Sequence, residues 1–376
     1  MFYSAGPDPE KRIAFYLSSL GGGGAQRVVL TLANAMAEQG QNIDLVLAKA
    51  KGAFLQEVHP KLHVVDLRAR NVMMSLPGLI RYLRRARPVA LLSSLKHVNV
   101  IALLARQLSG VPVRIVVGEH NTLSQSRQSG LKNLVLPSMM RSLYPKADLV
   151  VAVSQGVADD LCESLGLAKE RVQVIFNPVV RSDLALLAAE PLSHAWFQRG
   201  EPPVIMGMGR LTEQKDFPNL IQAFASLREQ RACRLMILGE GELRGDLEAL
   251  VKQLGLTDSV SLPGFVDSPF AYMSRAAVFA LSSRWEGLPT VLIEAMACGT
   301  PVVSTDCPSG PREILEGGVW GRLVGIGDSA ALAAAIAATL DDEESPKVTQ
   351  RAEAFRVEPA RDRYLQALLP LGELGK

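Results

Sequence analysis

The sequence predicts an α/β protein made of two doubly wound halves, each with its own parallel sheet. Apolar runs rich in Val, Ile and Leu alternate with helix-like segments along the chain, a pattern typical of parallel strands buried on both faces. The alternation breaks after residue 179 and starts again at residue 203. A glycine-rich turn separates the first apolar run from a helical pattern, as at the start of a doubly wound unit.

The first half contains six apolar runs that we expect to form strands. After Gly24, apolar residues recur at helical spacing as far as Gly40, which predicts a helix between the first two strands. The first domain is therefore expected at residues 1–180, with strands at 12–20, 43–48, 89–95, 113–120, 148–154 and 172–179.

The second half repeats this rhythm after a proline-containing linker at residues 181–202. We expect a second domain at residues 203–345, followed by helices at 346–376 that pack back across the joint. Because open parallel sheets bind ligands at the carboxyl ends of their strands, the two sheets are expected to face each other across a cleft. The strands of this half are expected at 203–209, 233–239, 260–266, 277–283 and 301–306.

The composition fits a globular protein, with 48% hydrophobic and 21% charged residues among 376. The sequence lacks an uncharged apolar run long enough to span a membrane and shows no signal-peptide pattern. The four cysteines are scattered without the spacing of a metal site, which is typical of reduced thiols in the cytoplasm. We therefore expect a cytoplasmic protein.

Basic residues are concentrated in the first half of the chain. Residues 1–178 carry 21 basic and 12 acidic side chains, a net charge of +9, and the remainder carries 19 and 26, a net charge of −7. Such a bias predicts a negatively charged partner, although a solvated basic surface remains the alternative. Aromatic residues are only 5%, which argues against a nucleic-acid surface that stacks bases.

Two basic segments with apolar neighbours predict peripheral docking on an anionic membrane surface. The segment 131–146 mixes apolar side chains with three basic residues, and the segment 81–87 carries four arginines. Docking of this kind would bring the protein to the cytoplasmic face of the inner membrane. The alternative is that the apolar residues belong to helix cores. The basic residues concerned are Arg81, Arg84, Arg85, Arg87, Lys132, Arg141 and Lys146.

The loops at the predicted strand ends carry the candidate binding residues. In "GGGGAQR", the glycines, among them Gly23 and Gly24, leave backbone N–H groups open to a phosphate at a helix N-terminus. The loop lacks the spacing of a nicotinamide-cofactor site or a P-loop. After the strand that ends near Gly209, Arg210 and Lys215 are cations suited to a diphosphate.

The stretch "RWEGLPTVLIEAMACG" at residues 284–299 contains two glutamates with seven residues between them. Pro289 favours a first helical turn and Gly299 a helix end, so Glu286 is expected in a loop and Glu294 inside the helix. The N–H groups of Gly287 and Leu288 would face a phosphate. A carboxylate on an apolar helix needs donors, which ribose hydroxyls provide. A salt bridge within the core is the alternative.

These segments together resemble the family 4 retaining glycosyltransferases, which have the GT-B fold. "EGLPTVLIE" resembles the family's E-x7-E motif, "GGAQRVV" its first glycine loop, and "GEGELRGDLE" the loop and helix before the donor site. The resemblance spans nearly the whole chain. Gln26 departs from it, since the family commonly has Glu there. The segment "DCPSGPREIL" at 306–315 resembles relatives that use UDP-sugars.

The resemblance implies a role for each candidate residue. Arg210 and Lys215 would hold the donor diphosphate, Glu286 would contact sugar hydroxyls, and Glu294 would bind the ribose. His120, at the end of "VVGEH", matches the family's active-site histidine, so His120, Glu286, Arg210 and Lys215 are the candidate catalytic residues. The expected nucleotide-binding set is Gly23, Gly24, Arg210, Lys215, Val266, Glu286, Gly287, Leu288 and Glu294.

The expected activity is transfer of a hexose or N-acetylhexosamine from a nucleotide-diphosphate sugar, with UDP favoured, to an acceptor hydroxyl with retained anomeric configuration. Preplaced cations and a helix N-terminus would stabilise the leaving diphosphate. No Asp-x-Asp motif is present, so no metal or other cofactor is expected. The expected acceptor is a polyprenyl-diphosphate-linked glycan intermediate of bacterial surface polysaccharide or glycoprotein glycan assembly. The alternatives are a nucleotide-sugar epimerase or phosphorylase on this fold, a soluble acceptor, or a non-catalytic binding protein.

Overall fold

The computed structural model describes residues 12–369 except 22, 125–131 and 345, and it leaves the side chains of 132–134 undescribed. The chain forms two compact units. The first contains the residues up to Pro178 and the C-terminal segment from Val357, and the second runs from Val179 to Arg356.

The first unit is built on a seven-stranded parallel sheet with the order β3-β2-β1-β4-β5-β6-β7. The central strand β1 is buried along its whole length and pairs with β2 and β4, with Ile13 opposite both Ile43 and Ala90. The strands are β1 Ile13–Leu17, β2 Ile43–Leu47, β3 His63–Asp66, β4 Ala90–Ser94, β5 Arg114–Glu119, β6 Leu149–Ala152 and β7 Val172–Val174.

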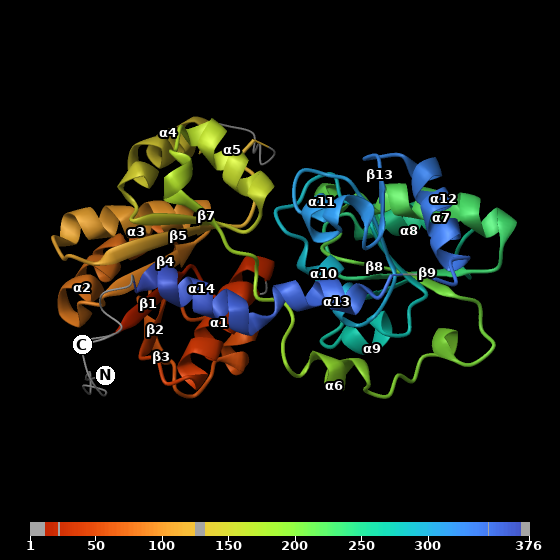
Figure 1. The fold of residues 1–376 in the computed structure, drawn as a ribbon, viewed down its shortest axis with the longest axis horizontal. Helices are drawn as coiled ribbons and strands as arrows, with labels where there is room; N and C mark the ends of the chain where they lie inside the picture. Colours follow the sequence, from red (N-terminus) through yellow and green to blue (C-terminus); the bar gives the residue numbers. More distant parts are fainter. Residues whose placement is uncertain (1–11, 22, 125–131, 345, 370–376) are drawn as a thin grey trace. The chain divides into compact units, whose positions relative to one another are not determined.

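Helices cover both faces of this sheet (Figure 1). On one face, α1 (Gly24–Glu38) packs against α14 (Val357–Leu368), the last helix of the described chain. Apolar side chains of both helices, such as Leu32 and Tyr364, close a core over the sheet. The other helices of the unit are α2 Leu76–Ala86, α3 Lys96–Ser109, α4 Lys132–Leu143 and α5 Gln155–Leu165.

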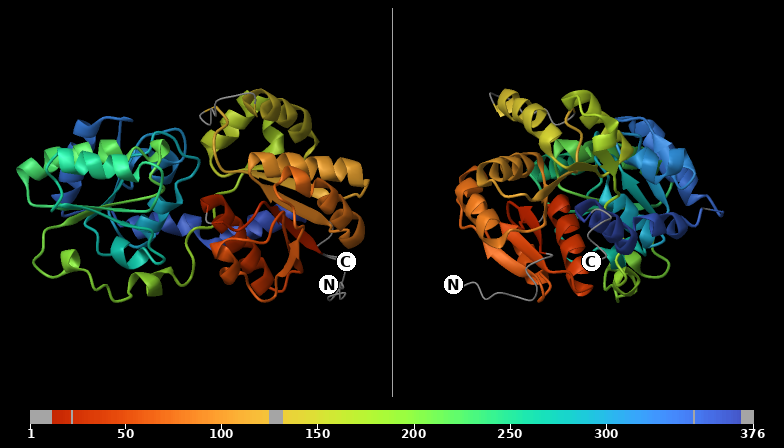
Figure 2. Two further views of the ribbon diagram at one scale, coloured as in Figure 1. Left: turned by 180° about the vertical axis from the view of Figure 1, so that it is seen from behind. Right: turned by 60° about the vertical axis from the view of Figure 1, so that its left-hand side comes forward.

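The second unit has a six-stranded parallel sheet with the order β10-β9-β8-β11-β12-β13. Figure 2 shows this sheet, in green and blue, between helical layers. Its strands are β8 Val204–Met208, β9 Arg234–Leu238, β10 Val260–Gly264, β11 Val278–Leu281, β12 Val302–Thr305 and β13 Arg322–Val324. Its helices are α6 Leu184–Ala188, α7 Phe217–Gln230, α8 Arg244–Gln253, α9 Phe270–Met273, α10 Thr290–Ala297, α11 Pro311–Ile314, α12 Ser329–Leu340 and α13 Val348–Ala352.

The prediction of two doubly wound halves is confirmed, and each predicted strand contains an observed one. Two observed strands, β3 and β13, were not predicted. Both lie at sheet edges and are largely exposed or half-buried, so they lack the apolar run that marks a buried strand.

The segment 181–202, expected to be a plain linker, contains α6 and a short 3-10 helix at Ala195–Phe197, and α6 packs on α9 within the second unit. Further 3-10 helices lie at Ala53–Glu57, Met73–Ser75, Tyr144–Lys146, Lys169–Arg171, Glu213–Lys215, Glu316–Gly318 and Glu353–Phe355. The expected C-terminal helices are divided, with α13 in the second unit and α14 in the first.

Candidate active site

The carboxyl edge of the second sheet carries a buried ion pair between Lys215 and Glu286. Lys215 Nζ lies 2.6 Å from Glu286 Oε1, and the two side chains are only 15% and 8% exposed. Lys215 follows β8, whereas Glu286 follows β11, the neighbouring strand in the sheet. The sequence predicted both residues for this edge, and the fold brings them into direct contact.

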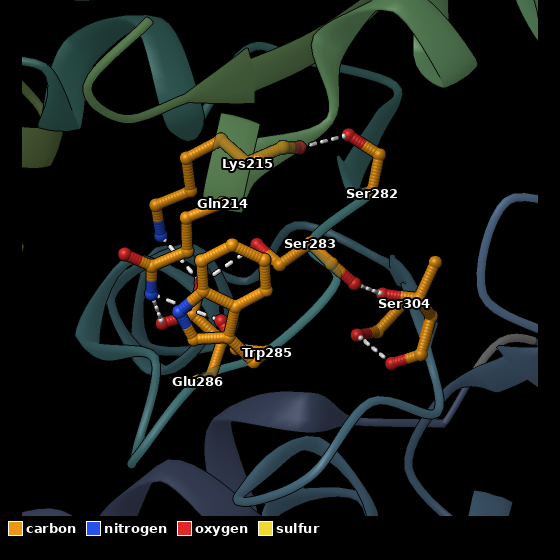
Figure 3. A network of polar contacts seen from close by, with 8 residues as sticks. Gln214, Lys215, Ser282, Ser283, Trp285, Glu286 and Ser304 are labelled. Atoms are coloured by element: carbon orange, nitrogen blue, oxygen red, sulfur yellow. Dashed lines mark hydrogen bonds and ion pairs between the residues drawn. The ribbon is translucent and has the colours of Figure 1, made fainter. Parts of the chain in front are cut away.

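Two further side chains form hydrogen bonds with the Glu286 carboxylate (Figure 3). Ser283 Oγ donates to Glu286 Oε1 at 2.7 Å, and Gln214 Nε2 approaches Oε2 at 3.5 Å while donating to the Trp285 carbonyl at 2.9 Å. A carboxylate that is removed from water needs such donors to remain charged. Neither Gln214 nor Ser283 was predicted from the sequence, although Gln214 directly precedes Lys215 and Ser283 lies three residues before Glu286.

Glycines shape the backbone that supports this pair. A Cβ at Gly209 would lie 2.9 Å from Lys215 Cε, so glycine allows the lysine side chain to lie along the backbone. Gly310 has φ near +100°, and a Cβ there would lie 2.8 Å from the Gly287 carbonyl oxygen. A hydrogen bond of 2.8 Å from the Glu286 N–H to the Pro308 carbonyl holds these two loops close together.

Helix α10 follows the Glu286 loop directly, with Pro289 as its N-cap and Gly299 just beyond its end at φ +83°. Gly287 and Leu288 are buried, and their backbone N–H groups make no hydrogen bond within the described part of the chain. They therefore supply donors beside a helix N-terminus, where negative charge is favoured. Glu294 is half-buried within α10, as expected, and its charge contributes to the raised pKa, about 12, of the Cys298 thiol, which is due mainly to burial.

The remaining predicted residues of this unit lie apart from the ion pair. Arg210 is exposed, two residues after β8. Val266 is half-buried in the loop after β10, which is the edge strand two positions from β8.

The buried Cys307 thiol lies near Glu286, and its pKa is raised to about 12, mainly by burial and then by the Glu286 charge. It is therefore protonated at neutral pH.

In the first unit, Gly23 and Gly24 are exposed at the start of α1. A Cβ at Gly24 would meet nothing within 4 Å, so packing does not require glycine there. Gln26 Oε1 accepts from the Gly23 N–H at 3.3 Å. The amide oxygen of Gln26 thus caps the helix where the family commonly has a carboxylate.

His120 follows β5 directly and is buried, with 8% exposure. Its Nε2 is enclosed and has no hydrogen-bond partner among the described residues. Burial lowers the pKa of His120 to about 4, so the imidazole is neutral at physiological pH. A Cβ at Gly118 would lie 2.9 Å from Ser94 Oγ and 3.8 Å from His120 Nε2; the ring therefore lies close to the end of β4.

The residue before His120 is a second buried carboxylate, Glu119, which the sequence analysis did not select. It accepts hydrogen bonds from Tyr144 and from Asn99, the latter at 3.0 Å. The signal in the sequence was the pair "EH" at the end of an apolar strand, where an acidic residue is out of place unless its charge is compensated.

Among the described residues, no group of three or more His, Cys, Asp or Glu side chains could hold a metal ion. The four cysteines form no disulfide. Within the same part of the chain, no helix is both long and apolar enough to cross a bilayer.

Two doubly wound parallel units of this kind define the GT-B class of architecture, and the ion pair lies at the sheet edge where such proteins bind ligands. Comparison with known protein families supports the GT-B assignment. The family described as "Glycosyltransferase Family 4" matches residues 22–182, and "Glycosyl transferases group 1" matches residues 190–354.

Two relatives match over nearly their whole length. The N-acetylgalactosamine-N,N'-diacetylbacillosaminyl-diphospho-undecaprenol 4-alpha-N-acetylgalactosaminyltransferase of Campylobacter jejuni is 30% identical, over 94% of this chain and 98% of the relative. The lipopolysaccharide core biosynthesis glycosyltransferase LpsE of Rhizobium meliloti is 28% identical, over 92% and 96%. The chain belongs to the family 4 glycosyltransferases and is a glycosyltransferase.

Solved structures share the fold at lower identity. Anabaena Alr3699/HepE in complex with UDP-glucose superimposes with a TM-score of 0.76 at 22% identity, covering 95% of this chain and 99% of that one. The lipopolysaccharide outer core galactosyltransferase WaaB gives 0.72 at 21% identity, covering 95% and 99%. At this identity the likeness establishes the GT-B fold.

Proposed function

We propose that this enzyme transfers a hexose or N-acetylhexosamine from a UDP-sugar to a polyprenyl-diphosphate-linked glycan, with retention of the anomeric configuration. The observation that carries the proposal is the Lys215–Glu286 pair, which joins a cation and the carboxylate expected to bind sugar hydroxyls at one sheet edge. The Campylobacter jejuni relative is named for a diphospho-undecaprenol acceptor, and HepE for its complex with UDP-glucose.

Each residue at the carboxyl edge of the second sheet has a proposed role that suits its chemistry. Lys215, with the exposed Arg210, meets the charge that develops on the leaving diphosphate. The N–H groups of Gly287 and Leu288 add donors to the same charge. Glu286 accepts from sugar hydroxyls, while Ser283 and Lys215 hold its carboxylate in place. These groups act without a metal ion, since the cations are supplied by the chain.

The acceptor side belongs to the first unit. Neutral His120 at the end of β5 can polarise or position groups at the reacting carbon, because its imidazole is not protonated at physiological pH. Gly23 and Gly24 leave room for a phosphate or sugar to approach the start of α1.

Helix α2 and the 3-10 helix Met73–Ser75 before it offer a surface for membrane docking. Arg81, Arg85 and Arg87 are exposed, and Met73 and Met74 are 65% and 58% exposed. Arg84 serves a structural purpose as well, since its Nε and Nη2 donate to the carbonyls of Ser109 and Leu108 at the end of α3. Docking at the cytoplasmic face would bring the acceptor's headgroup to the enzyme.

The test combines a panel of nucleotide sugars with a synthetic polyprenyl-diphosphate-linked acceptor, and nuclear magnetic resonance of the product. We expect transfer from one or more UDP-sugars and an anomeric coupling that matches the donor. An inverted product contradicts retention, and preference for GDP-sugars contradicts the UDP assignment. Turnover with a soluble glycan but not with the lipid-linked one contradicts the proposed acceptor.

A further inference from the structure

A second polar network lies inside the first unit, at the carboxyl end of β5, the strand that His120 follows. Glu119 accepts from the Tyr144 hydroxyl and from Asn99 Nδ2. Asn99 Nδ2 also donates to the Gly118 carbonyl at 3.0 Å, and Asn99 Oδ1 accepts from Ser93 Oγ at 2.7 Å. All four side chains are no more than 1% exposed.

The network joins four elements at one point. Ser93 belongs to β4, Asn99 to α3, Glu119 to β5, and Tyr144 to the 3-10 helix after α4. Asn99 is the hub, because it holds both the carbonyl of Gly118 and the side chain of Glu119. The two residues that precede His120 are therefore held from the α3 side of the sheet.

A buried carboxylate is energetically unfavourable as a purely structural contact of a strand. Removing it from water costs several kcal/mol unless donors compensate, and an apolar residue would fill the same space without that cost. The carboxylate is also placed at the carboxyl edge of the sheet, where ligands of such folds bind, and next to a residue matching an active-site histidine. This placement indicates a role in the reaction.

We propose that Glu119 is a positioning residue for glycosyl transfer: its hydrogen bonds to Tyr144 and Asn99 lock the end of β5 and so fix where the His120 ring lies. The proposal rests on the proposed role of His120. Misplacement of a reacting or orienting group by about 1 Å lowers a rate by up to about a hundredfold, so a small relaxation of this lock is measurable.

Titratable groups from three elements interact with Glu119, and protonation of Glu119 makes this hydrogen-bond network sensitive to pH. Tyr144 donates to it, Lys96 on α3 attracts its charge, and Asp160 on α5 opposes it. Burial is the largest influence and raises the pKa of Glu119, whereas burial lowers the pKa of Lys96. Protonation of Glu119 as the pH falls should weaken the lock and contribute to the acid limb of kcat.

The experiment compares Glu119→Gln and Tyr144→Phe with the wild-type enzyme. Glu119→Gln keeps the size of the side chain but turns it into a partial donor facing the Asn99 amide. Tyr144→Phe removes a single hydroxyl and keeps the ring packing, and it covers the case in which Glu119→Gln does not fold. Glu163→Gln, which removes an exposed carboxylate of the same unit, is the matched control.

Three readouts separate positioning from mere stability. With the UDP-sugar that gives turnover in the panel, kcat should fall between about tenfold and about a hundredfold, and its acid limb should move in Glu119→Gln. The affinity for UDP should stay within about twofold, because Arg210, Lys215 and Glu294, which are expected to hold the nucleotide, all lie in the second unit. The imidazole resonances of His120 should shift, while those of His194 in the second unit stay unchanged.

The outcomes are distinct. Unchanged kcat and unchanged His120 resonances in a folded Glu119→Gln or Tyr144→Phe variant overturn the proposal, as does failure of both variants to fold, which would make the network structural. If His120→Ala retains full turnover, the proposed role of His120 fails and the positioning proposal fails with it. If His120→Ala is inactive but Glu119→Gln is normal, only the positioning proposal fails.

Discussion

The two sheets each end in a buried carboxylate, and the two carboxylates have different kinds of partner. Glu286 in the second unit is paired with a cation, Lys215, at 2.6 Å. Glu119 in the first unit is held by uncharged donors, Tyr144 and Asn99. In the first arrangement a lysine balances the charge of the carboxylate. In the second, burial is the largest influence on Glu119 and raises its pKa.

The difference teaches how the same residue type serves two purposes. The ammonium of Lys215 has three donors, so under the proposed function we expect it to meet a diphosphate while it still contacts Glu286. The hydrogen bonds of Glu119 come from neutral donors instead, and this carboxylate is proposed to act on His120 through the backbone.

The largest effect is expected for Lys215→Ala. Loss of the cation removes charge stabilisation of the leaving group and leaves Glu286 buried without its ion-pair partner, so kcat should fall about 10²–10³-fold. The measurement is the rate of UDP release with donor and acceptor, and Lys252→Ala on the surface of α8 is the control. A loss of less than about threefold would remove Lys215 from the catalytic set.

Glu294→Gln should weaken nucleotide binding by about 1–3 kcal/mol, the range for hydrogen bonds to charged groups. The amide presents a donor where ribose hydroxyls need an acceptor. Calorimetry with UDP measures the change, and Glu229→Gln, exposed on α7, is the control. Equal affinity for the two variants would exclude the ribose role.

The basic surface of the first unit should show a smaller effect. Arg81→Ala with Arg85→Ala should weaken binding to anionic vesicles by about 2 kcal/mol, since each basic residue near such a surface contributes about 1 kcal/mol. Arg84 is left intact because it caps α3. Flotation with added salt is the measurement, and Arg228→Ala with Lys252→Ala in the second unit is the control. Absence of wild-type binding at low salt would contradict docking.

The raised pKa of Glu119 predicts a modest pH dependence of stability. Its folded-state pKa lies above the ordinary value of 4.5, so the folded state binds more protons between the two values and stability falls as the pH rises through that window. Glu119→Gln should lack this contribution, so its free energy of unfolding relative to wild type should increase with pH across the window. Urea unfolding at several pH values tests this, and parallel curves for both proteins would contradict it.

The smallest effect is expected from metal removal. Chelation with EDTA should leave turnover nearly unchanged, because Lys215, Arg210 and backbone donors are proposed to meet the leaving-group charge. Activity that is lost with EDTA and restored by magnesium or manganese would overturn the metal-free mechanism.

Much of this arrangement could be predicted from the sequence, because buried parallel strands leave continuous apolar runs and their ends mark the ligand-binding edge. The positions of Lys215 and Glu286 followed from that rule, although their direct contact did not, since it depends on the order of strands in the sheet. Strands β3 and β13 were missed because edge strands are partly exposed.

The Glu119 network could not be predicted, because it joins residues that are up to 51 positions apart in sequence, from Ser93 to Tyr144. A single Glu at a strand end has many explanations, and only the fold shows that Asn99 and Tyr144 meet it. The roles proposed for Arg210, Val266 and Glu294 remain predictions from the family resemblance, and the described contacts do not join them to the ion pair.

The return of α14 to the first unit has a consequence for how the protein is made. Residues up to Pro178 leave the ribosome first, but the helix that covers α1 and the adjoining strands begins only at Val357. Throughout synthesis of the second unit, the apolar surface that receives Tyr364 and Leu368 is without its cover. The first unit to emerge is thus the last to be completed, and we expect its uncovered apolar surface to favour aggregation during translation.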